Sequence, residues 1–115
     1  MAYNESLANR VREALAHLPE VEEKKMFGGI AFMVDGKMCI TVGKDRIMCR
    51  IDPGVHDEAI RNEGIQTVKM RGRDYKGYIH INEEVIKTKK NFNHWVELAL
   101  DFNKKAKASR KNKRR

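Results

Sequence analysis

The first twenty residues carry apolar side chains at helical spacing. Three or four positions separate most successive apolar residues, so they fall on one side of an α-helix. The members of this stripe are Leu7, Val11, Ala14, Leu15 and Leu18. Asn4 can cap the N-terminus of the helix, and Pro19 cannot continue it. The pattern therefore predicts one amphipathic helix with a single buried face.

Apolar and polar residues alternate with a period of two between residues 22 and 52, which is typical of β-strands. The predicted strands are residues 24–27, 30–34, 37–42 and 46–51. Asp35-Gly36 predicts a tight hairpin, because a type I′ turn requires a positive φ at both central residues. Pro53-Gly54 ends this series of strands.

A second group of elements follows Gly54. The predicted elements are a short helix at 55–63 closed by Gly64, strands at 66–71 and 75–82, and a final helix at 91–105. The apolar stripe of the final helix consists of Phe92, Trp95, Val96, Ala99 and Phe102. Short turns favour antiparallel pairing, and amphipathic helices must cover a face of the sheet. We therefore expect a two-layer α+β fold with a largely antiparallel sheet, the order α-β(4)-α-β(2)-α and helices packed on one face.

The two expected turns fix the register of the central strands. With loops at 35–36 and 43–46, the expected cross-strand pairs are Phe32 with Cys39, Ile40 with Cys49 and Val42 with Ile47. Cys39 and Cys49 then point to opposite faces of the sheet, and a disulfide between them needs a slip of one residue. We therefore expect two reduced thiols, as in a cytosolic protein.

The same register divides the apolar side chains between two faces of the sheet. The face expected under the helices carries Ala31, Met33, Met38, Ile40, Val42, Ile47, Cys49 and Ile51. The second face carries Ile30, Phe32, Val34, Cys39 and Met48. A solvated sheet face normally carries polar residues, so this second apolar set needs cover from a helix or another subunit. We hypothesise that these five side chains form a homodimer interface.

The chain has 115 residues and a formal net charge of +8. This length fits one domain, no apolar run approaches the roughly 20 residues that span a bilayer, and the N-terminus lacks a signal-peptide pattern. We therefore expect a cytoplasmic protein with no membrane partner. Residues 103–115 hold eight basic and no acidic residues, whereas the residues before them hold 16 of each. The expected division is a domain at 1–102 and a basic, flexible tail at 103–115.

The basic tail has two interpretations. Cations are favoured near the C-terminus of a helix and also improve solubility. Closely spaced cations can instead neutralise phosphates, giving nucleic-acid binding that is independent of sequence and sensitive to salt. The residues concerned are Lys104, Lys105, Lys107, Arg110, Lys111, Lys113, Arg114 and Arg115. The tail contains no aromatic residues and no recognition helix, so we expect no base readout.

Three kinds of residue invite a chemical interpretation, and for each we favour a structural one. Gly28-Gly29 lacks the Lys-Ser/Thr of a phosphate-binding loop, so we interpret it as a bulge or a tight strand connection. Methionines within alternating strands are expected to fill gaps in the core rather than to bind a soft metal. The four histidines and two cysteines lack the spacing of a metal site, and no catalytic triad is evident. We therefore expect no catalytic, cofactor-binding or metal-binding residues.

The segment around the paired glycines also resembles a known family. The resemblance is carried by the run at 25–34, which contains Met26-Phe27-Gly28-Gly29, and by Asp35-Gly36-Lys37-Met38, the strand at 47–52, Gly77-Tyr78-Ile79 and Trp95-Val96. Together they are similar to the TfoX/Sxy N-terminal domain family over residues 5–102. The resemblance implies that the glycines shape the chain, and it defines no catalytic residues. Full-length TfoX proteins regulate natural competence, are thought to act with the cyclic-AMP receptor protein at promoters, and carry a C-terminal helical domain. Because a basic tail follows the similar region here, we expect a stand-alone member.

These observations lead to three hypotheses of function. The first is a non-enzymatic regulatory or protein-interaction module, linked by the resemblance to transcription or competence regulation and to partners in the transcription machinery. The second is a protein that associates with nucleic acid nonspecifically through its tail. The third is a small enzyme or ligand-binding domain that uses a cleft between sheet and helices, for which the sequence nominates no residues.

Overall fold

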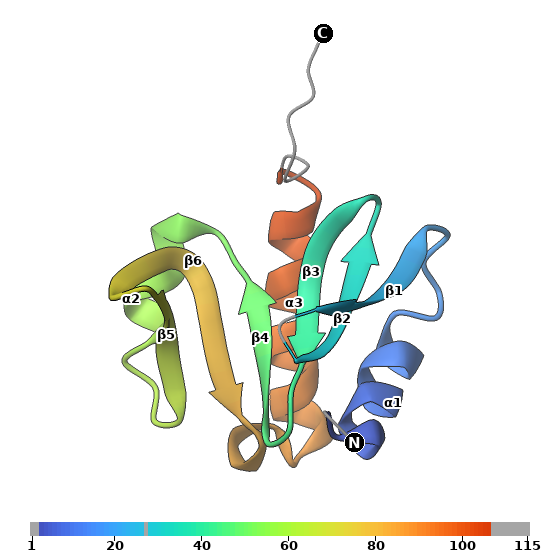
Figure 1. The fold of residues 1–115 in the computed structure, drawn as a ribbon, viewed down its shortest axis with the longest axis horizontal. Helices are drawn as coiled ribbons and strands as arrows, with labels where there is room; N and C mark the ends of the chain where they lie inside the picture. The colour runs from blue at the N-terminus through green and yellow to red at the C-terminus, as the bar shows by residue number, and fades with distance from the viewer. Residues whose placement is uncertain (1–2, 27, 107–115) are drawn as a thin grey trace, which may run out of the picture.

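The computed structural model describes residues 3–26 and 28–106 of the chain. This part forms an antiparallel sheet with helices on one face (Figure 1). The strands are β1 (Val21–Met26), β2 (Gly29–Val34), β3 (Lys37–Val42), β4 (Arg46–Arg50), β5 (Ile65–Met70) and β6 (Arg73–Asn82). The helices are α1 (Glu5–Ala14), α2 (His56–Ala59) and α3 (Lys89–Asn103), with 3₁₀ turns η1 (Pro53–Val55) and η2 (Glu83–Ile86). The strand order is β1-β2-β3-β4-β6-β5, and the predicted α+β class is confirmed.

The first helix begins as predicted, whereas the second is shorter than predicted. The side-chain oxygen of Asn4 accepts a hydrogen bond from the Leu7 N–H at 3.0 Å and so caps α1. The expected helix at 55–63 reduces to η1 and the four residues of α2. After Ala59 the backbone hydrogen bonds tighten, since the Asn62 N–H donates to the Ala59 carbonyl three residues earlier at 3.2 Å.

The hydrophobic core lies between the sheet and the helices. In Figure 1 the strands lie in front of α3, which crosses behind β3 and β4. The sheet contributes Ile40, Val42, Ile47, Ile79 and Ile81, and the helices contribute Leu7, Val11, Trp95, Val96 and Ala99. Burying one such large side chain stabilises a fold by roughly 1.5–3 kcal/mol. These two sets of side chains therefore hold the helical layer against the sheet.

The β2–β3 hairpin has the predicted turn but a different register. Asp35 and Gly36 have φ angles of 58° and 78°, as a type I′ turn requires. The register shifts between Phe32 and Met33, so that Phe32 lies opposite Ile40 rather than opposite Cys39 as predicted. Cys39 is the additional residue, so β3 contains a β-bulge that the sequence pattern did not reveal.

The other two predicted cross-strand pairs are confirmed in the β3–β4 hairpin. Ile40 lies opposite Cys49, and Val42 lies opposite Ile47. The register is regular there because the β3–β4 pairing begins after the bulge.

The bulge exchanges the faces that we assigned to the side chains of β2, because one extra residue reverses the alternation between paired strands. The residues that lie in the helix-covered core, contrary to prediction, are Ile30, Phe32, Val34 and the bulge residue Cys39. The residues that face away from the helices, contrary to prediction, are Ala31, Met33 and Met38. Met48 alone of the five predicted interface residues lies on the second face. The predicted interface set is therefore wrong, since four of its members belong to the core cluster between the sheet and the helices.

Both cysteines are free thiols in the same core cluster. The prediction that they point to opposite faces is therefore wrong, because the bulge turns Cys39 toward the helices together with Ile40. Burial raises the pKa of Cys39 to about 12 and also raises the pKa of Cys49. Neither thiol therefore forms a thiolate readily at neutral pH.

Candidate functional site

The sheet face turned away from the helices is rich in methionine. Residues opposite each other in antiparallel strands share a face, so the row Ala31, Thr41, Met48 and His80 marks this side, which we call the open face. Strand alternation places on it Met26, Met33, Met38, Met48 and Met70. These are all the methionines in the described residues, and none belongs to the core cluster. The interpretation of the methionines as core gap-fillers is wrong for Met26, Met38 and Met70, which are only partly buried. Met33 and Met48 are 8% and 7% exposed and do count among the buried hydrophobic residues.

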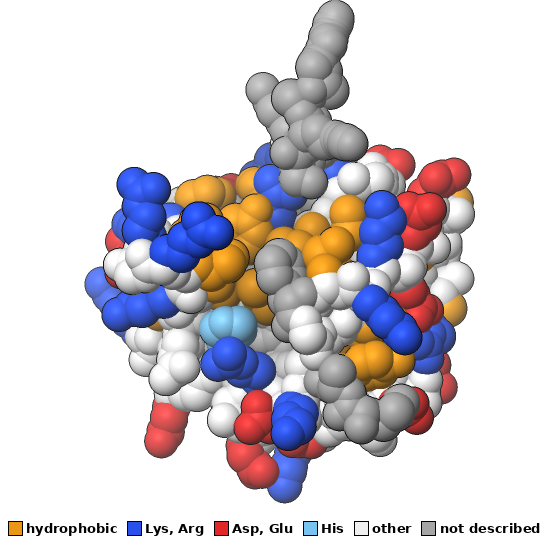
Figure 2. Space-filling model, in the orientation of Figure 1, with side chains coloured by type: hydrophobic (Ala, Val, Ile, Leu, Met, Phe, Trp, Pro, Cys, Tyr) orange, Lys and Arg blue, Asp and Glu red, His pale blue; other side chains and the backbone are white. Residues whose placement is uncertain are grey.

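Basic side chains surround the apolar part of the open face. Figure 2 shows hydrophobic side chains gathered over the middle of this face, with Lys and Arg side chains around them. The sheet segments 21–50 and 65–82 hold ten Lys or Arg against five Asp or Glu. Residues 1–20, 51–64 and 83–102 hold six Lys or Arg against 11 Asp or Glu. The domain is neutral in total, but its sheet is positively charged and its helical layer is negatively charged.

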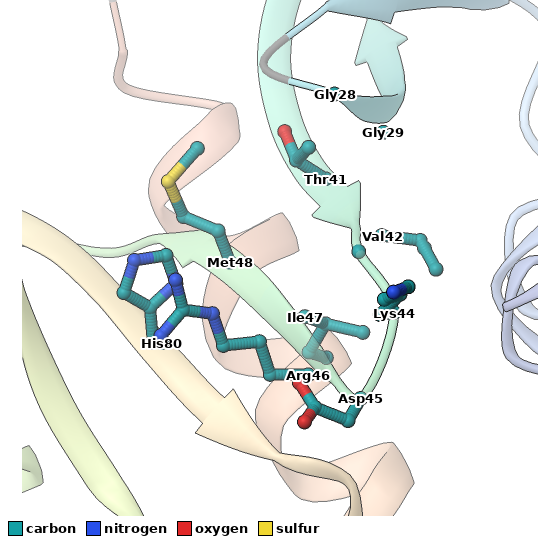
Figure 3. A pocket seen from close by; sticks show the side chains of 11 residues that line it. Gly28, Gly29, Thr41, Val42, Lys44, Asp45, Arg46, Ile47, Met48 and His80 are labelled. Atoms are coloured by element: carbon teal, nitrogen blue, oxygen red, sulfur yellow. The ribbon is translucent and has the colours of Figure 1, made fainter. Parts of the chain in front are cut away.

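A hollow of about 290 Å³ opens on the open face. Thr41, Met48 and His80 line it from three adjacent strands, and Lys44 and Arg46 line it from the β3–β4 hairpin (Figure 3). Lys44 and Arg46 are exposed, and within the described residues neither forms an ion pair. The hollow therefore combines apolar surface, hydrogen-bonding groups and a net positive charge, since Lys44 and Arg46 outnumber Asp45 in its lining.

Two polar atoms at this hollow lack a hydrogen-bond partner among the described residues. They are the Thr41 hydroxyl oxygen and the Nδ1 atom of His80. Thr41 is only 6% exposed. Burial and then the charge of Arg46 lower the pKa of His80 to about 4, so its imidazole is neutral at pH 7. A neutral imidazole has one N–H donor and one acceptor nitrogen, and a threonine hydroxyl can both donate and accept.

The paired glycines form one wall of the hollow. Gly28 has a φ of +72°, and a Cβ atom at Gly29 would overlap the carbonyl of Val42. The pair thus makes the turn from β1 to β2 and allows a close approach of β2 to β3. The predicted tight strand connection is confirmed, although Phe27 in the same motif lies outside the described residues.

The buried His56 is a structural residue, as predicted. Its Nδ1 accepts a hydrogen bond from the Gly77 N–H at 2.9 Å, so Nε2 carries the proton and donates to the Thr67 hydroxyl at 3.0 Å. Within the described residues, no group of three or more His, Cys, Asp or Glu side chains could hold a metal ion. In the same residues, no helix is long and apolar enough to cross a membrane.

Only the beginning of the predicted tail is part of the described structure. Asn103 is buried, and its side-chain amide donates to the Val34 carbonyl at 3.2 Å. Lys104 follows the end of α3, and Lys105 lies 3.2 Å from the carboxylate of Asp52. The predicted nucleic-acid residues outside the described residues are Lys107, Arg110, Lys111, Lys113, Arg114 and Arg115.

The sequence interpretation did not nominate the residues that meet in the hollow. Thr41 lies between Ile40 and Val42 and His80 between Ile79 and Ile81, so each is a polar residue with apolar neighbours in its strand, which was the available signal. Thr41 and His80 lie near each other only because β6 pairs with β4, although α2 and β5 separate these two strands in the sequence. The bulge at Cys39 also determines which face of β2 packs beside them.

The comparisons with known proteins identify a family. The model of the TfoX N-terminal domain matches residues 13–103, which is most of the chain. No curated protein and no solved structure matches the chain. The resemblance noted in the sequence is thereby confirmed. The chain belongs to the TfoX N-terminal domain family.

Proposed function

We propose that this protein is a non-enzymatic regulatory module that binds a protein partner through the open face of its sheet. The observation that carries the proposal is that all five described methionines lie on this face and outside the core cluster. Methionine side chains are unbranched and adapt to irregular apolar surfaces, as binding surfaces for varied partners require.

The apolar side chains that remain partly exposed on the open face support binding of a partner that would cover them. Met26, Met38 and Met70 are only partly buried within the protomer, and Tyr75 on β6 is 37% exposed. An antiparallel sheet with a solvated face usually alternates apolar residues with polar ones, and contiguous apolar patches often mark interaction sites. The chain belongs to the TfoX N-terminal domain family. A regulatory role, with the transcription machinery as the partner class, is what the family resemblance implies, and it agrees with this proposal.

The test compares equivalent substitutions on the two sides of the sheet. The full chain, its Met38→Gln variant and a Leu98→Gln control on α3 are used to capture proteins from a native lysate. A partner held by the wild type is then purified and titrated against all three proteins. We expect Met38→Gln to weaken binding at least about tenfold, because a polar amide replaces an adaptable apolar contact.

Two results would contradict this proposal. One is equal affinity of the partner for the wild type and the Met38→Gln variant. The other is loss of binding in the Leu98→Gln control with the Met38→Gln variant unaffected, which would place the interface on the helical layer. Thermal unfolding of each variant verifies that the proteins compared are folded.

A second candidate function is nonspecific association with nucleic acid. The excess of basic residues in the sheet segments favours it, in addition to the basic tail. Fluorescence anisotropy with duplex DNA and RNA over a salt series tests it, using the full chain and a chain ending at residue 106. Truncation there keeps Asn103 and its hydrogen bond to Val34. If the tail supplies the affinity, truncation reduces both the binding and its dependence on salt; unchanged binding removes the tail from this function.

A further inference from the structure

The unpartnered atoms on the open face are unusual for a folded protein. Most buried polar side-chain atoms have a hydrogen-bond partner, and an unsatisfied one destabilises the fold. The Thr41 hydroxyl and His80 Nδ1 lie on strands that flank the same residue of β4, Met48. Two such atoms in one cross-strand row point to a group that binds between them.

Met48 is the side chain that such a group would displace. It lies directly opposite both Thr41 and His80 in the paired strands, and all three line the hollow. Its rotatable, unbranched side chain can move without distorting the sheet. The hollow of about 290 Å³ offers space for an incoming side chain, since one water molecule occupies about 30 Å³.

The charges around the hollow determine which group fits. Lys44 and Arg46 carry positive charge without an ion pair in the described structure, and Asp45 between them carries the one negative charge of the lining. In Figure 3 the side chain of Arg46 extends toward His80. An anionic group there would accept hydrogen bonds from a hydroxyl and an imidazole N–H while compensating an arginine.

The composition of the surrounding face favours a carboxylate from a protein over a phosphate from a nucleic acid. Methionines provide most of the apolar surface, whereas base stacking requires aromatic side chains. The tyrosines nearby, Tyr75 and Tyr78, pack edge to face against each other with ring centroids 6.4 Å apart. Apolar and acidic side chains of one protein segment would complement both the methionines and the basic residues around them.

We propose that Thr41, His80 and Arg46 form a pocket that binds the carboxylate of an Asp or Glu side chain in an acidic, apolar segment of the protein partner. The inference rests on the proposed function, since it names the chemistry of that partner. In the complex the Thr41 hydroxyl and a His80 N–H donate to the carboxylate oxygens, and Arg46 neutralises their charge.

The pocket can be tested by NMR on the full-length protein labelled with ¹⁵N and ¹³C. The probes are a twelve-residue peptide of leucine and glutamate at helical spacing, the same peptide with glutamine for glutamate, and a twelve-residue oligothymidine. We expect the acidic peptide to shift the signals of Thr41 and the His80 ring and to bind at least about tenfold more tightly than the neutral one.

Two variants examine the individual residues. Arg46→Gln should weaken binding of the acidic peptide about tenfold, whereas Arg61→Gln, an exposed arginine after α2, should leave it unchanged. Thr41→Val should weaken binding while the Tm stays the same or rises, because valine removes a hydroxyl that has no hydrogen-bond partner among the described residues. A lowered Tm would instead indicate a hydroxyl that is bonded within the protein, and would overturn its assignment to the pocket.

The probes separate failure of the pocket from failure of the binding face. Equal binding of the acidic and neutral peptides at the open face overturns the carboxylate pocket and leaves the proposed function in place. If neither peptide perturbs the open face, the carboxylate pocket is overturned, and the proposed function is then decided by the comparison of Met38→Gln with Leu98→Gln. If oligothymidine shifts Thr41 and His80 and displaces the acidic peptide, the pocket binds nucleic acid and the inference is wrong.

Discussion

Both faces of the sheet carry apolar side chains, but of different kinds. The helix-covered face uses mainly isoleucine and valine, whose branched side chains have few rotamers and pack against fixed neighbours. The open face uses methionine, which adopts many shapes at little energetic difference. One face therefore specifies a single internal arrangement, and the other is suited to an external surface that is not part of the chain.

The two faces also differ in whether their buried polar atoms have hydrogen-bond partners. On the helix side, both ring nitrogens of the buried His56 have partners, in Gly77 and Thr67. On the open face, Thr41 and His80 each have a buried polar atom without one among the described residues. A protein core formed during folding satisfies its hydrogen bonds internally, whereas a binding surface completes them with its ligand. This difference, more than the apolar composition, supports the open face as the binding face proposed above.

The strongest test of the comparison removes one apolar side chain from each face. Ile40→Ala should reduce the free energy of unfolding by about 2–5 kcal/mol, because it leaves a cavity beneath α3. Met38→Ala should reduce it by less than about 1 kcal/mol, since Met38 is only partly buried and outside the core cluster. Urea unfolding monitored by the fluorescence of Trp95 measures both. Similar losses in the two variants would mean that the open face is part of the core.

The two glycines of the β1–β2 connection provide a second comparison. Gly29→Ala should destabilise the protein toward the upper end of about 1–3 kcal/mol, because its Cβ would overlap the Val42 carbonyl. Gly28→Ala should reduce stability by about 1 kcal/mol, since it has free space and only its positive φ is unfavourable. Unfolding free energies and the amide shift of Thr41 report the two effects. A larger loss at Gly28 would contradict the close approach of β2 and β3.

The smallest expected effect is the dependence of stability on pH through His80. Its pKa is about 4 in the folded protein and 6.5 in an unperturbed histidine, so the unfolded chain takes up a proton first as the pH falls. The contribution of the neutral imidazole is therefore present above pH 6.5 and is lost progressively between pH 6.5 and 4. We expect a loss of less than about 1 kcal/mol, because the residue is partly exposed.

His80→Gln should remove this part of the pH dependence while keeping a polar side chain. The difference in unfolding free energy between the wild type and the variant, measured from pH 7 to 5, isolates His80 from the other titrating groups. NMR titration of the His80 ring gives its pKa directly. An ordinary pKa near 6.5 would mean that neither burial nor Arg46 acts on the imidazole.

Local patterns in the sequence determined most of the elements of this fold. The Asn4 cap, the β3 strand and the turn at Asp35-Gly36 were predicted correctly, because each depends on a few neighbouring residues. The short α2 was overestimated, since apolar spacing does not show where backbone hydrogen bonds tighten into turns. The family could also be recognised from the sequence, because its motifs are contiguous.

The faces of the sheet were beyond prediction from local patterns. A single inserted residue, Cys39, reverses the alternation between β2 and β3, and nothing in its immediate sequence distinguishes it from a regular strand residue. The positions of Ile30, Phe32 and Val34 in the core follow from that one bulge.

The sequence by itself therefore determined the class of fold, the order of its elements and the family, because these depend on periodicity and on short motifs. The tertiary structure decided which apolar side chains form the core and which form the open face. It also brought Thr41, Met48 and His80 into one row, through pairing between strands that lie far apart in the chain. The physical reason is that side chains alternate with every residue, so long-range pairing and a single bulge fix what a local pattern leaves open.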